Sequence, residues 1–254
     1  MKRVFPLFLI SLSLALAGCV GHPADDEDDP STPGGATPGA PVSQASLLLD
    51  FTATWCVNCP RMAAAVEEAA QERPGKVIPV SIHYHDAFAC PEGEALAGDF
   101  GVQAYPSLIV DLSPASLLTA TSKDLILARM DATTGRRNGR CSLDLTLDTP
   151  SPGQFTLHAE ATVSRAGAYK LGALLLEDGV TAPQTGGSDN YVHDNILRKT
   201  LSGSIAGEDL GSLSPGASAR KDFSFSTDGA GRFHVVAYVT DGELVQTAAA
   251  ISLP

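Results

Sequence analysis

Two cysteines stand three residues apart in the chain, at Cys56 and Cys59. Thiols at this spacing can exchange electrons with other thiols and disulfides, hold a zinc ion, or close a small structural disulfide. A zinc site of this kind needs a second close pair of ligands, and the sequence contains no second Cys-x-x-Cys. The elements that flank the pair must therefore decide between a redox site and an inert disulfide.

The segments around the two cysteines favour a redox site. Residues 46–51 form an apolar run typical of a buried strand, and apolar residues recur at helical spacing over 62–70. A thiolate at the start of a helix is stabilised by unpaired backbone N–H groups and by the helix dipole, which lower the pKa of the thiol. Cys56 is then placed to act as a nucleophile, and Cys59 to attack the mixed disulfide that results. Because Pro60 cannot donate a helical hydrogen bond, we expect the helix to begin at Cys59.

Two segments of the chain resemble the thioredoxin superfamily. The first contains Leu-Leu-Asp-Phe at 48–51 and Thr-Trp-Cys-x-x-Cys at 54–59. The second is the stretch 101–108, which is similar to the cis-proline loop of that superfamily. The dipeptide between the cysteines is Val-Asn, where thioredoxins have Gly-Pro, and it strongly sets the redox potential.

The resemblance implies a role for each matching residue. Cys56 is the nucleophile, Cys59 is the resolving thiol, and Asp50 is a buried acid that carries the proton of that second thiol. No cofactor is implied.

The remaining matching residues shape the place where a substrate binds. Trp55 lies beside the cysteines, and Tyr105-Pro106 is expected to be a cis peptide bond against which substrate docks as an added strand.

Hydrophobic patterning divides the chain after residue 44 into two parts. Residues 45–138 alternate between strand and helix patterns, which predicts an α/β domain, and the resemblance described above implies that this domain is thioredoxin-like. Residues 139–254 show seven short strands separated by turn residues, which predicts an all-β antiparallel sandwich domain. The expected elements are strands at 46–51, 77–82 and 107–111 with helices at 62–70, 92–100 and 123–130, and then strands at 141–148, 154–163, 169–176, 190–200, 222–226, 233–240 and 245–252.

Five short motifs together resemble the twenty-eight-kilodalton outer-membrane-protein family. They are Ala-Thr-Trp-Cys-x-x-Cys-Pro-Arg at 53–61, His-Tyr-His-Asp-x-Phe at 83–88, Tyr-Pro-Ser at 105–107, Leu-Glu-Asp-Gly at 176–179 and Tyr-Val-His-Asp-Asn-x-Leu-Arg at 191–198. Members of that family are envelope lipoproteins with a thioredoxin-like domain followed by a β-rich domain. The resemblance implies this architecture and this location.

The N-terminus is typical of an exported bacterial protein. Two basic residues precede the apolar run 4–17, which is too short to span a membrane comfortably and ends at Leu-Ala-Gly before Cys19. Small residues before a cysteine resemble the bacterial lipobox, which implies a signal peptide at 1–18 and a lipid on Cys19 that anchors the chain to a membrane. Lipoproteins that stay in the inner membrane often carry Asp directly after the lipidated cysteine. This chain has Val20 at that position, which favours the outer membrane. The alternatives are an ordinary signal peptide with an incidental cysteine, or an uncleaved anchor.

Residues 19–44 are expected to be a disordered tether. The acidic run 25–29 and the Pro- and Gly-rich stretch 30–41 cannot bury enough apolar surface to fold. A spacer is the simpler interpretation, and an acidic surface-export signal is the alternative. The formal charge of the chain, −12, argues against nucleic-acid binding, which needs a basic face.

Export places the other cysteines in an oxidising compartment. We therefore expect Cys90 and Cys141 to form a structural disulfide, and the alternative is an additional redox thiol at Cys90.

Three histidines are candidates for functional residues. His83 and His85 alternate on a predicted strand. Ordinary strand-end histidines are the favoured interpretation, a metal site is the alternative, and no metal is assigned. His193 precedes Asp194 without a nucleophile motif such as Gly-x-Ser-x-Gly, so it is interpreted as a strand or loop feature.

The leading hypothesis is an outer-membrane-anchored thiol–disulfide oxidoreductase that acts on protein thiols or disulfides of the cell envelope. The alternative is a non-enzymatic surface lipoprotein in which the thioredoxin-like domain is a scaffold for binding.

Overall fold

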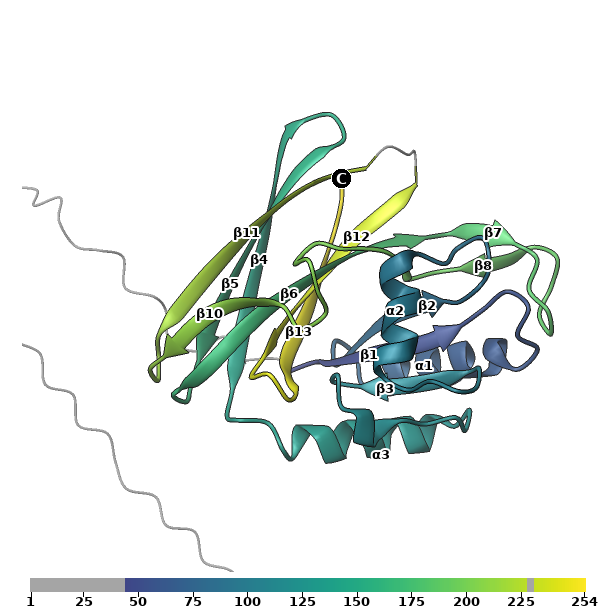
Figure 1. Cartoon of the computed structure of the whole chain (residues 1–254), viewed down its shortest axis with the longest axis horizontal. Coiled ribbons are helices and arrows are strands. Elements are labelled where there is room, and N and C mark those ends of the chain that lie inside the picture. Colours follow the sequence, from purple (N-terminus) through teal and green to yellow (C-terminus); the bar gives the residue numbers. More distant parts are fainter. Residues whose placement is uncertain (1–43, 228–230) are drawn as a thin grey trace, which may run out of the picture. The chain divides into compact units, whose positions relative to one another are not determined.

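The first part of the described chain builds three paired strands with helices on both faces (Figure 1). Its elements are β1 (Ser46–Thr52), α1 (Cys59–Glu72), β2 (Val77–His83), α2 (Pro91–Asp99), β3 (Ser107–Val110), a 3-10 helix (Pro114–Ser116) and α3 (Lys123–Thr134). Strand β1 pairs in parallel with β2 and antiparallel with β3. Because side chains alternate along a strand, Leu48 packs with α1 and α3, whereas Leu47 and Leu49 pack with α2. These elements confirm the predicted thioredoxin-like α/β fold.

The computed structural model describes residues 44–227 and 231–254. The predicted signal peptide (1–18), the lipidation site Cys19 and all but the last residue of the predicted tether (19–44) lie outside the described residues. Among the residues described, no helix is long and apolar enough to cross a membrane.

The second part is made of strands, as predicted. They are β4 (Cys141–Ser151), β5 (Gln154–Val163), β6 (Gly167–Asp178), β7 (Val180–Ala182), β8 (Tyr191–His193), β9 (Ile196–Thr200), β10 (Glu208–Leu213), β11 (Ser218–Ser226), β12 (Arg232–Thr240) and β13 (Val245–Ser252). The short strands β7 and β10 were not predicted. The expected strand at 190–200 is interrupted, because Asn195 adopts a left-handed backbone with φ 59°.

Two sheets face each other in this second part and form the predicted antiparallel sandwich. Strands β11, β5 and β4 make one sheet, and β6 and β12 belong to the other. Their facing side chains, among them Leu157 of β5, Phe223 of β11 and Val235 of β12, form one apolar cluster. Figure 1 shows these long strands together, with the helices gathered around β1, β2 and β3.

One sheet runs through both parts of the chain. Its strand order is β13-β12-β6-β9-β2-β1-β3, and β10 pairs with β6. The junction is the pairing of Ser81 in β2 with Ile196 in β9, and the Ser81 N–H donates to the Asn195 carbonyl at 2.7 Å. Strand β9 therefore brings the β7–β8 hairpin, which precedes it, to the edge of the thioredoxin-like sheet.

The predicted disulfide between Cys90 and Cys141 is wrong, because both are free thiols. Cys90 precedes α2 and packs against the apolar cluster shared by α2, β1 and β6. Cys141 begins β4 and is buried in the other cluster, inside the sandwich. The two sulfurs therefore belong to different cores.

Candidate functional site

Cys56 and Cys59 form a disulfide, with sulfurs 2.08 Å and Cα atoms 5.4 Å apart. Cys59 is the first residue of α1, as Pro60 predicts, and Cys56 lies in the turn before it. Both residues are buried, with Ala53 and the ring of Tyr105 packed around them. The pair thus lies at a helix start behind a buried strand, which is where the sequence places it.

Aromatic side chains form a row beside the disulfide. Trp55, 49% exposed, meets Tyr105 edge to face at 5.6 Å, and Tyr105 stacks on Tyr84 at 5.1 Å. The Trp55 indole N–H also donates to the Tyr84 carbonyl at 3.1 Å. The Tyr105-Pro106 bond is cis, as predicted. Tyr84 was missed from the sequence, since only folding brings the end of β2 to the cis-proline loop.

Asp50 lies in the middle of β1 and is 5% exposed. Burial raises the pKa of its carboxyl from 3.8 to about 7, because an ionised carboxylate loses solvation there. Its Oδ1 atom has no hydrogen-bond partner. Asp50 and Cys59 line the same cavity, of about 560 Å³. The predicted acid and the predicted resolving cysteine are therefore brought together, and this acid can gain or lose a proton near neutral pH.

The β7–β8 hairpin holds the loop that carries the cysteines. The Gln184 side-chain amide donates to the carbonyls of Ala53 at 3.1 Å and Cys56 at 2.9 Å. The next residue, Thr185, donates its backbone N–H to the Thr54 carbonyl at 2.8 Å. These contacts join residues about 130 positions apart, and no short motif in the sequence could have revealed them.

Gly186 lies directly against the cysteine loop. Its φ is +78°, and a Cβ atom there would lie 2.1 Å from the Val57 carbonyl oxygen. Only glycine fits this position, because both the backbone angle and the space exclude a side chain.

Asp86, which follows β2, also holds the loop that carries the cysteines. Asp86 accepts hydrogen bonds from the Thr54 N–H at 2.7 Å and from His83 Nδ1 at 2.7 Å. Burial opposes ionisation of Asp86, but the bonds from His83, Thr54 and Phe88 outweigh burial and lower its pKa to about 2. Asp86 is therefore an ionised anchor for the loop.

The two histidines of the alternative metal site, His83 and His85, have different surroundings. His83 is buried and bound to Asp86, whereas the His85 side chain is 64% exposed and lies 3.8 Å from Glu94. No group of three or more His, Cys, Asp or Glu residues within 44–227 and 231–254 is arranged to hold a metal ion.

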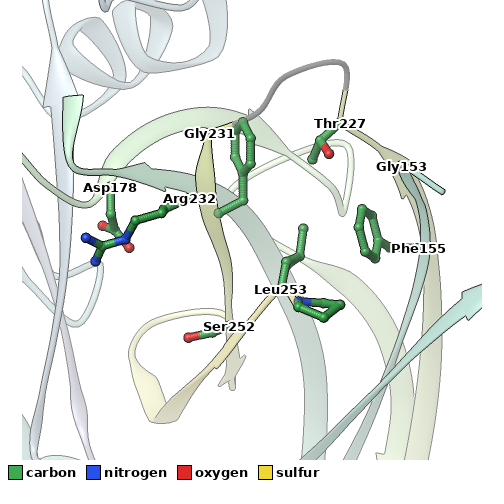
Figure 2. A pocket seen from close by; sticks show the side chains of 10 residues that line it. Gly153, Phe155, Asp178, Thr227, Gly231, Arg232, Ser252 and Leu253 are labelled. Carbon is green, nitrogen blue, oxygen red and sulfur yellow. The ribbon is translucent and has the colours of Figure 1, made fainter.

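Another cavity, of about 410 Å³, lies at the C-terminal end of the chain (Figure 2). Asp178, Arg232 and Leu253 are among the residues that line it. None of the predicted site residues contributes to it.

Comparisons with known proteins match both parts of the fold. The thioredoxin family model matches residues 40–114. A protein disulfide-isomerase of Aspergillus oryzae is 34% identical over 109 residues, which are 42% of this chain and 20% of that protein. A thioredoxin of Haemophilus influenzae is 37% identical over 68 residues, which are 27% of this chain and 58% of that protein. The chain thus matches only part of the length of either relative.

A solved structure shares the fold of both parts. HBP35 of Porphyromonas gingivalis has a TM-score of 0.68 at 22% identity, covering 85% of this chain and 77% of that one. The model of the family described as outer membrane protein Omp28 matches residues 94–250, which include the β7–β8 hairpin. Because that match extends over more than half of the sequence, the chain belongs to the Omp28 family of outer membrane proteins.

Proposed function

We propose that this protein is a thiol–disulfide oxidoreductase of the bacterial envelope that acts on the thiols and disulfides of other proteins. The observation that carries the proposal is the placement of the Cys56–Cys59 disulfide at the start of α1, on a cavity shared with the buried acid Asp50. An inert structural disulfide needs neither a helix start nor a neighbouring acid that titrates near neutral pH. The thioredoxin and disulfide-isomerase relatives support the same chemistry.

The geometry supports a two-step exchange. In the reducing direction, the Cys56 thiolate attacks one sulfur of a partner disulfide, and the other partner sulfur leaves as a thiolate. Asp50 then takes the proton of the Cys59 thiol, and the Cys59 sulfur attacks Cys56 and releases the second partner thiolate. The Cys56–Cys59 bond forms, the partner bond is broken, and two electrons have moved to the partner. The reverse sequence oxidises a partner dithiol.

The aromatic row is the proposed contact surface for the partner. Trp55 is half exposed and Val57 is 58% exposed, so apolar surface flanks the disulfide on the outside of the molecule. The cis-proline loop at Tyr105-Pro106 borders the same surface through the contact of Tyr105 with Trp55. We infer that an extended partner segment binds along this loop and places its sulfur next to Cys56.

The N-terminal sequence and the family support a location in the cell envelope. We propose that residues 1–18 are cleaved, that a lipid on Cys19 anchors the chain to the outer membrane, and that 19–44 spans the distance to the folded part. Labelled palmitate should enter the wild-type chain and not Cys19→Ser. Label in both proteins, or in neither, would contradict the anchor.

Insulin reduction in the presence of dithiothreitol tests the proposed activity. We expect turnover by the wild-type chain, none by Cys56→Ser, and wild-type rates for Cys90→Ser. Alkylation of the reduced protein should also show a Cys56 pKa below the ordinary value of about 8.5. A Cys56 pKa near that value together with absent turnover would overturn the proposal.

One observation favours the alternative of a binding scaffold. Cys56 is only 4% exposed, and Gln184 and Gly186 pack on the loop that carries it. If the hairpin stays closed, partner sulfurs cannot reach the pair. A disulfide that resists dithiothreitol in the folded protein and opens only on unfolding would favour this second function.

A further inference from the structure

The cavity beside Cys59 connects the redox pair with the C-terminal part of the chain. It is lined by Asp50, Cys59, Glu67, His83, Tyr191 and His193, among others. Asp50 and Cys59 come from the thioredoxin-like part, and Tyr191 and His193 come from β8. The exposed side chains of Glu67 and Val192 also line it, so the cavity reaches the surface.

Two residues that line this cavity each carry a buried polar atom without a protein partner. Within the described residues, four buried side-chain polar atoms lack a hydrogen-bond partner, and they belong to Asp50, Arg137 and His193. The residues Asp50 and His193 line the same cavity, while Arg137 is bound to Asp111 elsewhere. A cavity of about 560 Å³ has room for several water molecules, each of which takes about 30 Å³ in the liquid.

The His193 ring is held in a fixed orientation. It meets Tyr191, Phe88 and His83 edge to face at 4.8, 5.0 and 5.5 Å. The imidazole also hydrogen-bonds the backbone of Ala182, which leaves Nε2 as the nitrogen with a free lone pair. A rigid imidazole with one free nitrogen is suited to accept a proton and release it.

We propose that His193 exchanges the proton of Asp50 with solvent, through water held in this cavity. Because His193 acts on the redox pair only through Asp50, it is a positioning residue. The inference rests on the proposed thiol–disulfide exchange. When Asp50 takes the proton of the Cys59 thiol, that proton passes through water to His193 Nε2, and the imidazolium then releases it to bulk water. No electrons move in this step, and the Asp50 carboxylate is regenerated. When the Cys56–Cys59 bond is reduced instead, the proton runs the opposite way, from water through His193 and Asp50 to the Cys59 thiolate.

The charges around His193 suit a transient carrier. Burial lowers its pKa, the neighbouring His83 lowers it further, and Asp86 and Asp194 oppose this in part. Asp50, Glu67 and Tyr191 are the other titratable groups that face it across the cavity, together with Cys59 when the pair is reduced. His193 is therefore neutral at neutral pH and can take up a proton only briefly.

Single-turnover reduction of the disulfide by dithiothreitol, followed from pH 5 to 9, tests the proposal in the full chain. We expect His193→Gln to slow the reaction about tenfold at pH 7, less than the 10²–10⁴-fold typical of a direct acid or base, because it acts through Asp50. The variant should also lose the inflection that belongs to the imidazole. His234→Gln is the matched control, since His234 is also buried but pairs with Asp178, and neither residue lines this cavity.

A profile of His193→Gln that superimposes on that of the wild type, or that falls uniformly at every pH, would overturn the relay. In an Asp50→Asn background, His193→Gln should have no further effect, and an additive loss would also contradict it. This assay needs no protein partner. Absent insulin turnover with an altered His193→Gln profile would therefore remove the proposed function and leave the relay.

The wild-type chain provides a measurement that does not depend on how a variant folds. Reduction rates in mixtures of H₂O and D₂O should curve with the fraction of D₂O, because more than one proton moves through the relay. A linear dependence would show that a single proton moves and would contradict the proposal.

Discussion

The two cysteine pairs of the folded part differ in almost every physical respect. Cys56 and Cys59 are joined, lie at the start of a helix and border a cavity that contains a carboxyl group. Cys90 and Cys141 are free and pack into apolar clusters. Burial raises the pKa of both free thiols, and that of Cys141 to about 12, so neither is a thiolate at neutral pH.

This difference shows that the surroundings of a thiol, more than the compartment, decide its chemistry. The expected export to an oxidising compartment predicted a second disulfide, but a disulfide also needs two sulfurs within reach. Cys56 and Cys59 meet because they are three residues apart in one turn. Cys90 and Cys141 lie in different cores, and sequence spacing carries no information about that.

The largest expected effect comes from Asp50. Its pKa in the folded chain, about 7, lies above the ordinary 3.8, so the folded state binds the proton more tightly than the unfolded state. The stability that this provides is fully present below about pH 4 and is lost as the pH rises through 7, which amounts to about 4 kcal/mol. Asp50→Asn should remove this loss. Urea unfolding of both proteins from pH 4 to 8 measures it.

Asp131→Asn is the control for Asp50. Asp131 is exposed and pairs with Arg73 at the surface, so this change should cost less than about 1 kcal/mol. If the free energy of unfolding changed with pH by the same amount in the wild type and in Asp50→Asn, the carboxyl beside the redox pair would titrate like one at the surface.

The next effect concerns the hairpin that holds the redox pair. Gln184→Leu would remove two buried hydrogen bonds, one to the Ala53 carbonyl and one to the Cys56 carbonyl, at a cost of about 1–3 kcal/mol in total, although each carbonyl keeps a bond from a backbone N–H. Gln71→Leu is a matched control, because Gln71 is exposed and bonds only Glu67 on the same helix. Denaturant unfolding measures both. Equal stability of the two variants would show that the hairpin does not support the loop.

The smallest effects are expected at the free cysteines. Cys141→Ser places a hydroxyl in an apolar cluster, at a cost of about 1 kcal/mol, because the carbonyl of Ser142 that lies 3.7 Å from the sulfur remains a partner. Cys90 is half buried, and Cys90→Ser should change stability by less than about 0.5 kcal/mol. Neither should alter insulin reduction. Slower turnover in either variant would make that thiol part of the redox chemistry.

The sequence predicted those parts of the site that depend on local order. The strand containing Asp50, the helix start at Cys59 and the cis bond before Pro106 all follow from hydrophobic period, proline chemistry and a recognisable motif. The sequence did not predict Gln184 or His193 as site residues. Their positions depend on the single junction between β2 and β9, and the turn at Asn195 that allows it is not encoded in a periodic pattern.

A glutathione redox titration of the full chain, with each cysteine mapped by alkylation and peptide mass, tests the central claim most directly. The account predicts one transition in which Cys56 and Cys59 open and close together, while Cys90 and Cys141 remain reduced at every potential. A Cys56–Cys59 bond that stays closed throughout, or a transition that involves Cys90 or Cys141, would contradict it.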